Sequence, residues 1–241
     1  MEGFDPKTSF GPDVAASYDD ALRGDEDETV EFLAGLAGFE LALELAIGTG
    51  RIALPLSERG IRVDGIELSA DMIARLREKP GGENLTVVVG DMATAEAPGP
   101  YGLVYLIYNT FHNLQTQDDQ VRCFENAARH LTNDGVFVIE CELASMRRGR
   151  SFVDAERVGT DEVTLDVNRY DAVSQVLDEN HVRIGDGGIR MGPISQRLVH
   201  PSEMDLMARI AGLRLRHRWS GWREEPFTAS STRHVSVYGR G

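Results

Sequence analysis

Cysteines are scarce in this sequence, and long apolar runs are absent from it. Cys123 and Cys141 are the only cysteines, and their spacing is not that of paired metal ligands. We therefore expect buried thiols in a reducing compartment rather than a disulfide framework, and no metal site. No segment resembles a signal peptide, and none is apolar over the length needed to cross a membrane. These absences predict a cytoplasmic protein without a membrane partner.

Basic residues are also few. Lys and Arg total 25 against 39 acidic residues, which gives a formal net charge of -14. Proteins that bind nucleic acid usually carry a basic face that neutralises phosphates, so nucleic acid is not an expected partner. The arginines between residues 209 and 223 alternate with apolar residues, which favours a strand with one solvated face over an RNA-binding patch.

Familiar nucleotide-binding and catalytic patterns are missing as well. There is no GxxxxGK[ST] sequence, which excludes a triphosphate-binding loop, and the third glycine of GxGxxG is absent after the first glycine turn. The chain also lacks a Ser-His-Asp or Cys-His arrangement for nucleophilic catalysis. Dinucleotide oxidoreductases are therefore disfavoured.

Apolar runs alternate with helical patterns through the first 142 residues. Strands are expected at 41–46, 61–67, 85–89, 101–108 and 135–140, and helices around 29–36, 52–59, 70–79 and 121–131, with Ser69 as the N-cap of the third helix. This alternation predicts an α/β fold, with a mostly parallel sheet covered by helices on both faces.

The pattern changes after Glu142. Strands with alternating polar and apolar residues are expected at 162–170, 173–184 and 189–199, and GDGG (185–188) is a hairpin turn. A helix near 204–211 and strands at 213–220 and 234–238 follow. We predict a single domain with an N-terminal arm or lid (1–38), a core (39–144 and 200–241) and an inserted antiparallel β cap (145–199).

The stretch ELAIGTGR (44–51) ends the first expected strand in a glycine turn. Gly48 and Gly50 let the main chain approach a ligand and turn into a helix, whose first N–H groups can bind an anionic group. A tight turn that binds nothing is the alternative interpretation.

Carboxylates near this turn indicate what it binds. Glu67 follows the second strand and can accept hydrogen bonds from both hydroxyls of a ribose, and Asp91 follows the third strand and can bind an adenine amino group. Glu44, just before the turn, suits an ammonium group better than a pyrophosphate. Together these residues predict an amino acid joined to an adenosine.

Four ordered motifs resemble those of the class I S-adenosylmethionine-dependent methyltransferases. They are ELAIGTGR, GIELSADM (65–72), VVVGDM (87–92) and YGLVYLIYNTFHNL (101–114). The resemblance implies a Rossmann-like sheet of seven strands that ends in an antiparallel hairpin. It also implies S-adenosyl-L-methionine as the cofactor and S-adenosyl-L-homocysteine as the product.

The motifs imply a set of cofactor-binding positions. These are Glu44, Ala46, Gly48, Thr49, Gly50, Arg51, Glu67, Leu68, Met72, Asp91, Met92, Tyr108 and Asn109. The turn holds the methionine end, Glu67 holds the ribose, and Leu68 and Tyr108 flank the rings. The family more often has glycine where Ala46 stands, and alanine fits there if its φ angle is negative.

Two side chains are candidates for catalysis. The cofactor's sulfonium already activates the methyl group, so the enzyme chiefly aligns the acceptor and excludes water. His112, in NTFHN, is placed to take a proton from the acceptor, or else only to position it or cap the loop. Tyr18 resembles a tyrosine that orients substrate or closes the site in family members, although packing explains it equally well.

The inserted cap is expected to select the acceptor. It resembles the β caps of methyltransferases that act on amino sugars, glycine-like amines and peptide N-termini. Arg147, Arg148 and Arg150 could bind a carboxylate or phosphate of the acceptor, or form a solvated turn. Tyr170, His181 and Arg197 are further cap candidates.

These observations predict methyl transfer to a nitrogen or oxygen of a small molecule. The negative charge slightly favours an amine. A non-catalytic S-adenosylmethionine-binding module and a peptide or nucleic-acid methyltransferase remain alternatives, although the Asn/Asp-Pro-Pro-aromatic motif of DNA and rRNA amino methyltransferases is absent. An NAD-dependent oxidoreductase is disfavoured by the glycine spacing. The identity of the acceptor, the pathway and the choice between monomer and homodimer stay open.

Overall fold

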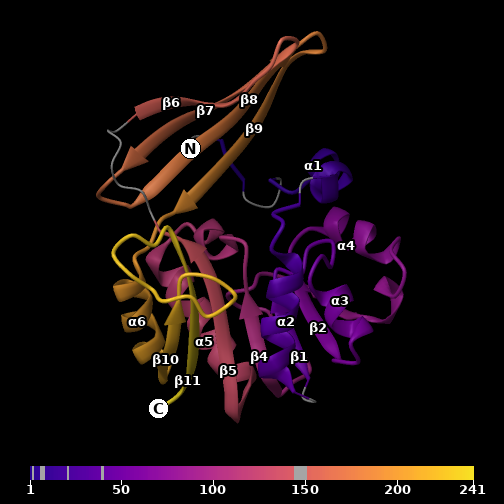
Figure 1. Cartoon of the computed structure of the whole chain (residues 1–241), viewed down its shortest axis with the longest axis vertical. Coiled ribbons are helices and arrows are strands. Elements are labelled where there is room, and N and C mark those ends of the chain that lie inside the picture. Colours follow the sequence, from indigo (N-terminus) through magenta and orange to yellow (C-terminus); the bar gives the residue numbers. More distant parts are fainter. Residues whose placement is uncertain (2, 6–8, 21, 39–40, 144–150) are drawn as a thin grey trace.

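The computed structural model describes residues 1, 3–5, 9–20, 22–38, 41–143 and 151–241. It consists of a seven-stranded sheet covered by helices, with a four-stranded antiparallel sheet above it (Figure 1). The expected fold class, a Rossmann-like α/β core with an inserted antiparallel cap, is confirmed. Among the described residues, no helix is both long and apolar enough to span a membrane.

The core sheet has the strand order β10-β11-β5-β4-β1-β2-β3. Its strands are β1 (Ala42–Leu45), β2 (Val63–Glu67), β3 (Thr86–Val89), β4 (Tyr101–Leu106), β5 (Leu131–Glu142), β10 (Leu213–Trp219) and β11 (Arg233–Arg240). The first five are parallel, while β11 is antiparallel to both β5 and β10. β4 ends before the expected residue 108 because Tyr108 and Asn109 have φ angles of 60° and 61°, which no strand accommodates.

Helices cover the two faces of this sheet with separate apolar cores. α2 (Glu26–Ala37), α3 (Ala53–Glu58) and α4 (Ala70–Arg77) pack on one face, and α5 (Gln117–His130) and α6 (Pro201–Ile210) pack on the other. Ser69 caps α4 as expected, since its hydroxyl accepts the Met72 N–H at 3.2 Å. Because both faces are covered, the carboxyl ends of the parallel strands are the open edge at which ligands bind.

The cap consists of consecutive antiparallel strands. They are β6 (Ser151–Val158), β7 (Glu162–Asp171), β8 (Val176–Gly185) and β9 (Gly188–Arg197). The hairpin turn expected at GDGG is confirmed between β8 and β9, whereas β6 had no counterpart among the expected strands. The cap lies above the carboxyl ends of β4 and β5 (Figure 1).

Arg197 fastens the end of the cap to the core. Its guanidinium is buried and donates to Gln175 at 2.6 Å and to Glu203 at 2.7 Å, and its carbonyl accepts Gln120 at 3.0 Å. Arg197 therefore joins β9 to α5 and α6. Its guanidinium binds side chains of the protein and does not line the cap cavity.

Candidate active site

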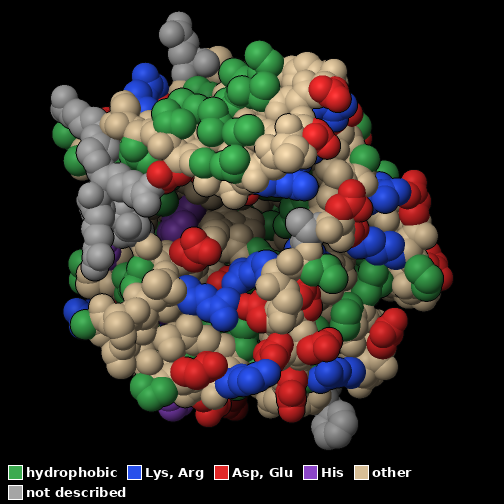
Figure 2. All heavy atoms as spheres, turned by 45° about the horizontal axis from the view of Figure 1, so that its top comes forward, with side chains coloured by type: hydrophobic (Ala, Val, Ile, Leu, Met, Phe, Trp, Pro, Cys, Tyr) green, Lys and Arg blue, Asp and Glu red, His purple; other side chains and the backbone are tan. Residues whose placement is uncertain are grey.

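Two cavities open at the carboxyl ends of the core strands. The first, which we call the edge cavity, has a volume of about 330 Å³ and is lined by residues that follow β1, β2, β3 and β4. The second, the cap cavity, has a volume of about 410 Å³ and lies between the core and the cap. Figure 2 shows the hollow between these two parts, with acidic and basic side chains along its rim.

The Glu67 carboxylate organises the edge cavity. Its two oxygens accept the N–H groups of Gly48 and Ser69, each at 2.8 Å, and the side chain is buried. Burial raises the pKa of this carboxyl group. Each oxygen retains a lone pair for a further donor, so the group can bind the hydroxyls of a ligand from a fixed position.

The structure explains which residue types fit at two positions of the glycine turn, Gly50 and Ala46. Gly50 has a φ of 77°, and a Cβ there would lie 2.3 Å from Leu76 Cδ1, so glycine permits the packing of α4. The expectation that Ala46 has a negative φ is wrong, because its φ is 58°. Alanine is strained by about 1–2 kcal/mol in this conformation, which explains why glycine is commoner at such a turn.

Glu44 lies behind the turn rather than in a cavity. Its buried carboxylate accepts the Tyr105 hydroxyl at 2.9 Å, which ties β1 to β4. Burial raises its pKa to about 8, and the nearby Glu67 adds to the shift. Met72 also supports the turn from behind, since its Cε lies 3.3 Å from the position that a Gly48 Cβ would take.

Five of the expected cofactor positions lie together in the edge cavity, whereas Tyr108, expected to flank the rings, does not line it. Its lining includes Ala46, Glu67, Leu68, Asp91 and Met92. The lining also includes residues that were not among the predicted cofactor-binding positions, namely Phe10, Ile66, Gly90, Thr110, Asn113, Leu114, Gln115, Thr116 and Asp119. Ile66, Gly90, Thr110, Asn113 and Leu114 lie within the quoted motifs, so the motifs located these residues without assigning them a role.

The N-terminal arm covers the glycine turn. Asp19 accepts the Thr49 hydroxyl and pairs with Lys79, both at 2.7 Å. Arg51 donates to the Tyr18 carbonyl at 2.5 Å and stacks over the Tyr18 ring, 4.7 Å from its centre. Thr49 and Arg51 therefore hold the arm through their side chains and are not among the residues that line the two cavities.

Tyr18 and Phe10 of the arm lie close to the site. Their rings are 6.3 Å apart, and the Phe10 carbonyl accepts the Ser69 hydroxyl at 2.6 Å. Burial raises the pKa of Tyr18, with Arg51 opposing the shift. Tyr18 is thus a protonated phenol beside the turn.

A second fastening of the arm was missed by sequence reasoning. Glu140 at the end of β5 is fully buried and accepts the Tyr108 N–H at 2.7 Å. Arg23 of the arm binds the same carboxylate and lies over the Tyr108 ring, 4.5 Å from its centre. These partners are far apart in the chain, so no local pattern could reveal the contact.

The cap cavity contains His112 and Asn109. Asn109 accepts the Glu142 N–H at 2.5 Å through its side chain, which fixes the loop after β4 against β5. His112 is 3% exposed, and its Nε2 makes no hydrogen bond within the described residues. Burial lowers the pKa of His112 to about 4, with Arg197 adding to the shift. The imidazole is therefore neutral near pH 7 and offers an acceptor.

Carboxylates are the only charged groups in the described lining of the cap cavity. The lining residues are Asn109, His112, Glu142, Leu143, Phe152, Asp154, Asp166, Asn168, Tyr170, Leu177, Glu179, Gln196 and Leu198. Four of them are acidic, and none is Lys or Arg. Burial raises the pKa of Glu179, and His181 opposes the shift while Asp166 adds to it.

The arginines expected to bind a carboxylate or phosphate of the acceptor are Arg147, Arg148 and Arg150. They lie outside the described residues. Of the other cap candidates, Tyr170 lines the cap cavity and His181 lies on β8 beside Asp166. Acceptor recognition by the described cap thus rests on acidic and neutral side chains.

Comparisons with known proteins agree with this architecture. A methyltransferase-domain family model matches residues 42–135. The cypemycin N-terminal methyltransferase of Streptomyces sp is 28% identical over 206 residues, which cover 82% of each chain. The dTDP-3-amino-3,6-dideoxy-alpha-D-glucopyranose N,N-dimethyltransferase of Streptomyces fradiae is 27% identical over 56% of this chain and 55% of its own.

A solved structure matches the whole chain. The CcbJ methyltransferase from Streptomyces caelestis superposes with a TM-score of 0.91 and is 34% identical, over 99% of this chain and 100% of that one. Core, arm and cap are therefore shared with a known methyltransferase.

Proposed function

Since this chain belongs to the class I S-adenosylmethionine-dependent methyltransferases, we propose that it methylates an amine nitrogen of a small molecule bound in the cap cavity. The cofactor supplies a methyl group made electrophilic by its sulfonium. The edge cavity fits the adenosine part, with Glu67 at the ribose hydroxyls and Asp91 at the adenine amino group. The turn at Gly48, whose own N–H donates to Glu67, would hold the methionine end of the cofactor.

The charge of the cap cavity carries the proposal for the acceptor. Glu142, Asp154, Asp166 and Glu179 line it, and no described lining residue is basic. Carboxylates in a partly dry cavity attract a cation and repel an anion, so they concentrate an ammonium and discriminate against acidic acceptors. A neutral phenol or alcohol is not attracted by these negative charges.

The bound amine must lose a proton before its lone pair can attack. Acidic surroundings favour the ammonium form, so a nearby group has to take that proton. Glu179 suits this role because its raised pKa makes it a stronger base than an exposed carboxylate. His112, with a pKa lowered to about 4, holds a proton poorly near neutral pH, so it accepts a hydrogen bond and orients the amine.

The relatives support an amine by their names. One curated relative methylates the N-terminus of cypemycin, and another dimethylates the amine of a dTDP-linked amino sugar. A primary amine is common to both kinds of acceptor. We propose only that the acceptor of this chain carries an amine, and we do not propose either relative's substrate for it.

A paired acceptor screen tests the proposal. Primary amines, including amino sugars and short peptides, are each compared with the analogue in which hydroxyl replaces the amine, and S-adenosylhomocysteine formation is measured. We expect turnover among the amines only, and Glu179→Gln should lower kcat more than KM. The amine proposal is contradicted if hydroxyl compounds alone are methylated. Cofactor binding without turnover of any acceptor would favour a binding module.

A further inference from the structure

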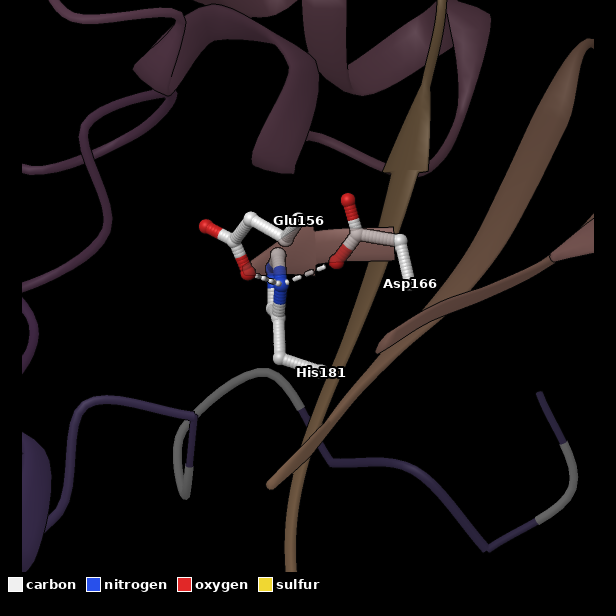
Figure 3. A group of neighbouring side chains, drawn as sticks. All are labelled: Glu156, Asp166 and His181. Atoms are coloured by element: carbon white, nitrogen blue, oxygen red, sulfur yellow. Dashed lines mark ion pairs between the residues drawn. The ribbon is translucent and has the colours of Figure 1, made fainter. Parts of the chain in front are cut away.

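We propose that Glu156, Asp166 and His181 form a site for a divalent transition-metal ion in the cap. The three side chains come from neighbouring strands and converge on one point (Figure 3). This inference does not rest on the proposed function, because its evidence is the geometry of these three side chains.

Strand register brings the three residues together. Asp166 on β7 and His181 on β8 are direct cross-strand partners. Glu156 lies where the register of β6 shifts between Ala155 and Arg157, so it belongs to a bulge. A bulge re-aims the side chain of the extra residue, and here the Glu156 carboxylate reaches the His181 ring.

The ligand atoms lie close to the spacing that a metal requires. His181 Nδ1 lies 2.6 Å from Asp166 Oδ1 and 3.5 Å from Glu156 Oε2, and all three atoms lie within 4.8 Å of one another. Ligand atoms about 2.0–2.2 Å from an ion stand roughly 3–4 Å apart. Side-chain adjustments of less than about 1 Å would therefore complete the geometry.

The contacts already present leave one of these atoms without a hydrogen bond. Asp166 Oδ1 is closed to solvent and accepts no hydrogen bond within the described residues, although His181 Nδ1 is close to it. Two carboxylate oxygens thus converge on one ring nitrogen without hydrogen-bond geometry. A central cation would give all three atoms a shared partner.

Local charge points in the same direction. Glu179 adds a further carboxylate that interacts electrostatically with all three residues, and three of the arginines on the described cap strands form ion pairs elsewhere. Arg157 and Arg183 pair with Glu162, and Arg169 pairs with Asp178. In the described part of the chain, no Lys or Arg neutralises Glu156 or Asp166.

The donor set selects the class of ion. One imidazole nitrogen and two carboxylate oxygens suit Zn²⁺ or Mn²⁺, whereas Ca²⁺ and Mg²⁺ prefer oxygen alone. The partial exposure of Glu156 and His181, 52% and 44%, leaves coordination positions for water. Because Asp166 also lines the cap cavity, the ion would stand at the edge of the acceptor site.

Metal titration tests the site without any assay of activity. Protein lacking a polyhistidine tag and treated with chelator is titrated with Zn²⁺ by calorimetry and with Mn²⁺ by electron paramagnetic resonance. We expect saturable binding of one ion per chain. Asp166→Asn and His181→Gln should each weaken it by about tenfold or more, because each removes a direct ligand.

His217→Gln is the matched control. His217 stacks on Trp219 on β10 of the core sheet, 5.0 Å between ring centres, so its loss should leave metal binding unchanged. Thermal unfolding of the metal-free variants checks that each one folds. The proposal is overturned if the wild type binds neither ion, or if both ligand variants bind as tightly as the wild type.

Discussion

The Arg23 guanidinium binds both carboxylate oxygens of Glu140, at 3.1 and 2.9 Å. Glu140 is fully buried at the carboxyl end of β5, and Arg23 belongs to the N-terminal arm. The pair therefore fixes the arm to the carboxyl end of β5. A bidentate pair of this kind adds geometric specificity to its electrostatic energy.

Removal of Arg23 should destabilise the fold. Arg23→Ala leaves the buried Glu140 carboxylate without its ion-pair partner, and only the Tyr108 N–H still donates to it. The unpaired buried charge should lower the free energy of unfolding by about 3 kcal/mol. The melting temperature should then fall by about 6–12 °C, as followed by circular dichroism. The double variant Arg23→Ala/Glu140→Gln removes the unpaired charge and should recover part of this loss. Additive losses would show that the pair does not couple.

Gly50→Ala should cost more than Gly60→Ala. Both glycines have a positive φ, 77° and 85°, so each alanine carries the same backbone strain of about 1–2 kcal/mol. Only at Gly50 would the new methyl overlap Leu76, which adds about 1–3 kcal/mol. Urea unfolding measures both free energies. Equal losses would mean that the turn and α4 separate easily.

Glu67→Gln should weaken S-adenosylhomocysteine binding. An amide cannot accept both the Gly48 and Ser69 N–H groups, and it loses the charge that strengthens hydrogen bonds to ribose. A loss of about 1.5–3 kcal/mol corresponds to roughly 10- to 100-fold in the dissociation constant. Glu78→Gln, which removes only a surface pair with Arg75, is the control for calorimetric titration. Unchanged affinity in Glu67→Gln would remove this residue from the cofactor site.

Acid should destabilise the fold through His112. The folded-state pKa of about 4 lies below the usual value of about 6.5, so the unfolded chain binds the proton more readily. The stability is fully present above pH 6.5 and is lost as pH falls towards 4. His112 should account for about 2 kcal/mol of the loss between pH 7 and pH 5.

Variants isolate this contribution. His112→Gln should flatten the dependence of the unfolding free energy on pH in that window. His234, whose pKa burial lowers to about 3, should behave similarly when replaced by glutamine. An unchanged slope in His112→Gln would mean that the pKa of His112 is not lowered in the folded state.

Local patterns were sufficient to predict the core. Helical spacing, the Ser69 cap and the alternation of strands and helices are determined within short windows, and the structure confirms them. The proximity of Glu67 and Asp91 follows from parallel strands that end at one edge, and both residues line the edge cavity. Their roles in cofactor binding stay predictions.

Other features could not be predicted because they depend on contacts between residues far apart in the sequence. Strand β6 is an edge strand whose residues are mostly exposed on both faces, so it has no alternating apolar pattern. The acidic cap cavity combines Glu142, Asp166 and Glu179 from three separate strands. Ala46 takes a positive φ because the turn imposes it, against the preference of the residue.

An acceptor that carries both an amine and a hydroxyl tests the central claim most directly. The enzyme is incubated with S-adenosylmethionine and amino sugars, each of which has both groups, and the site of methylation is located by mass spectrometry and NMR. The account predicts that the methyl group is found on nitrogen, because the carboxylates of the cap cavity hold the amine. Methylation on oxygen, with the amine left free, would contradict it.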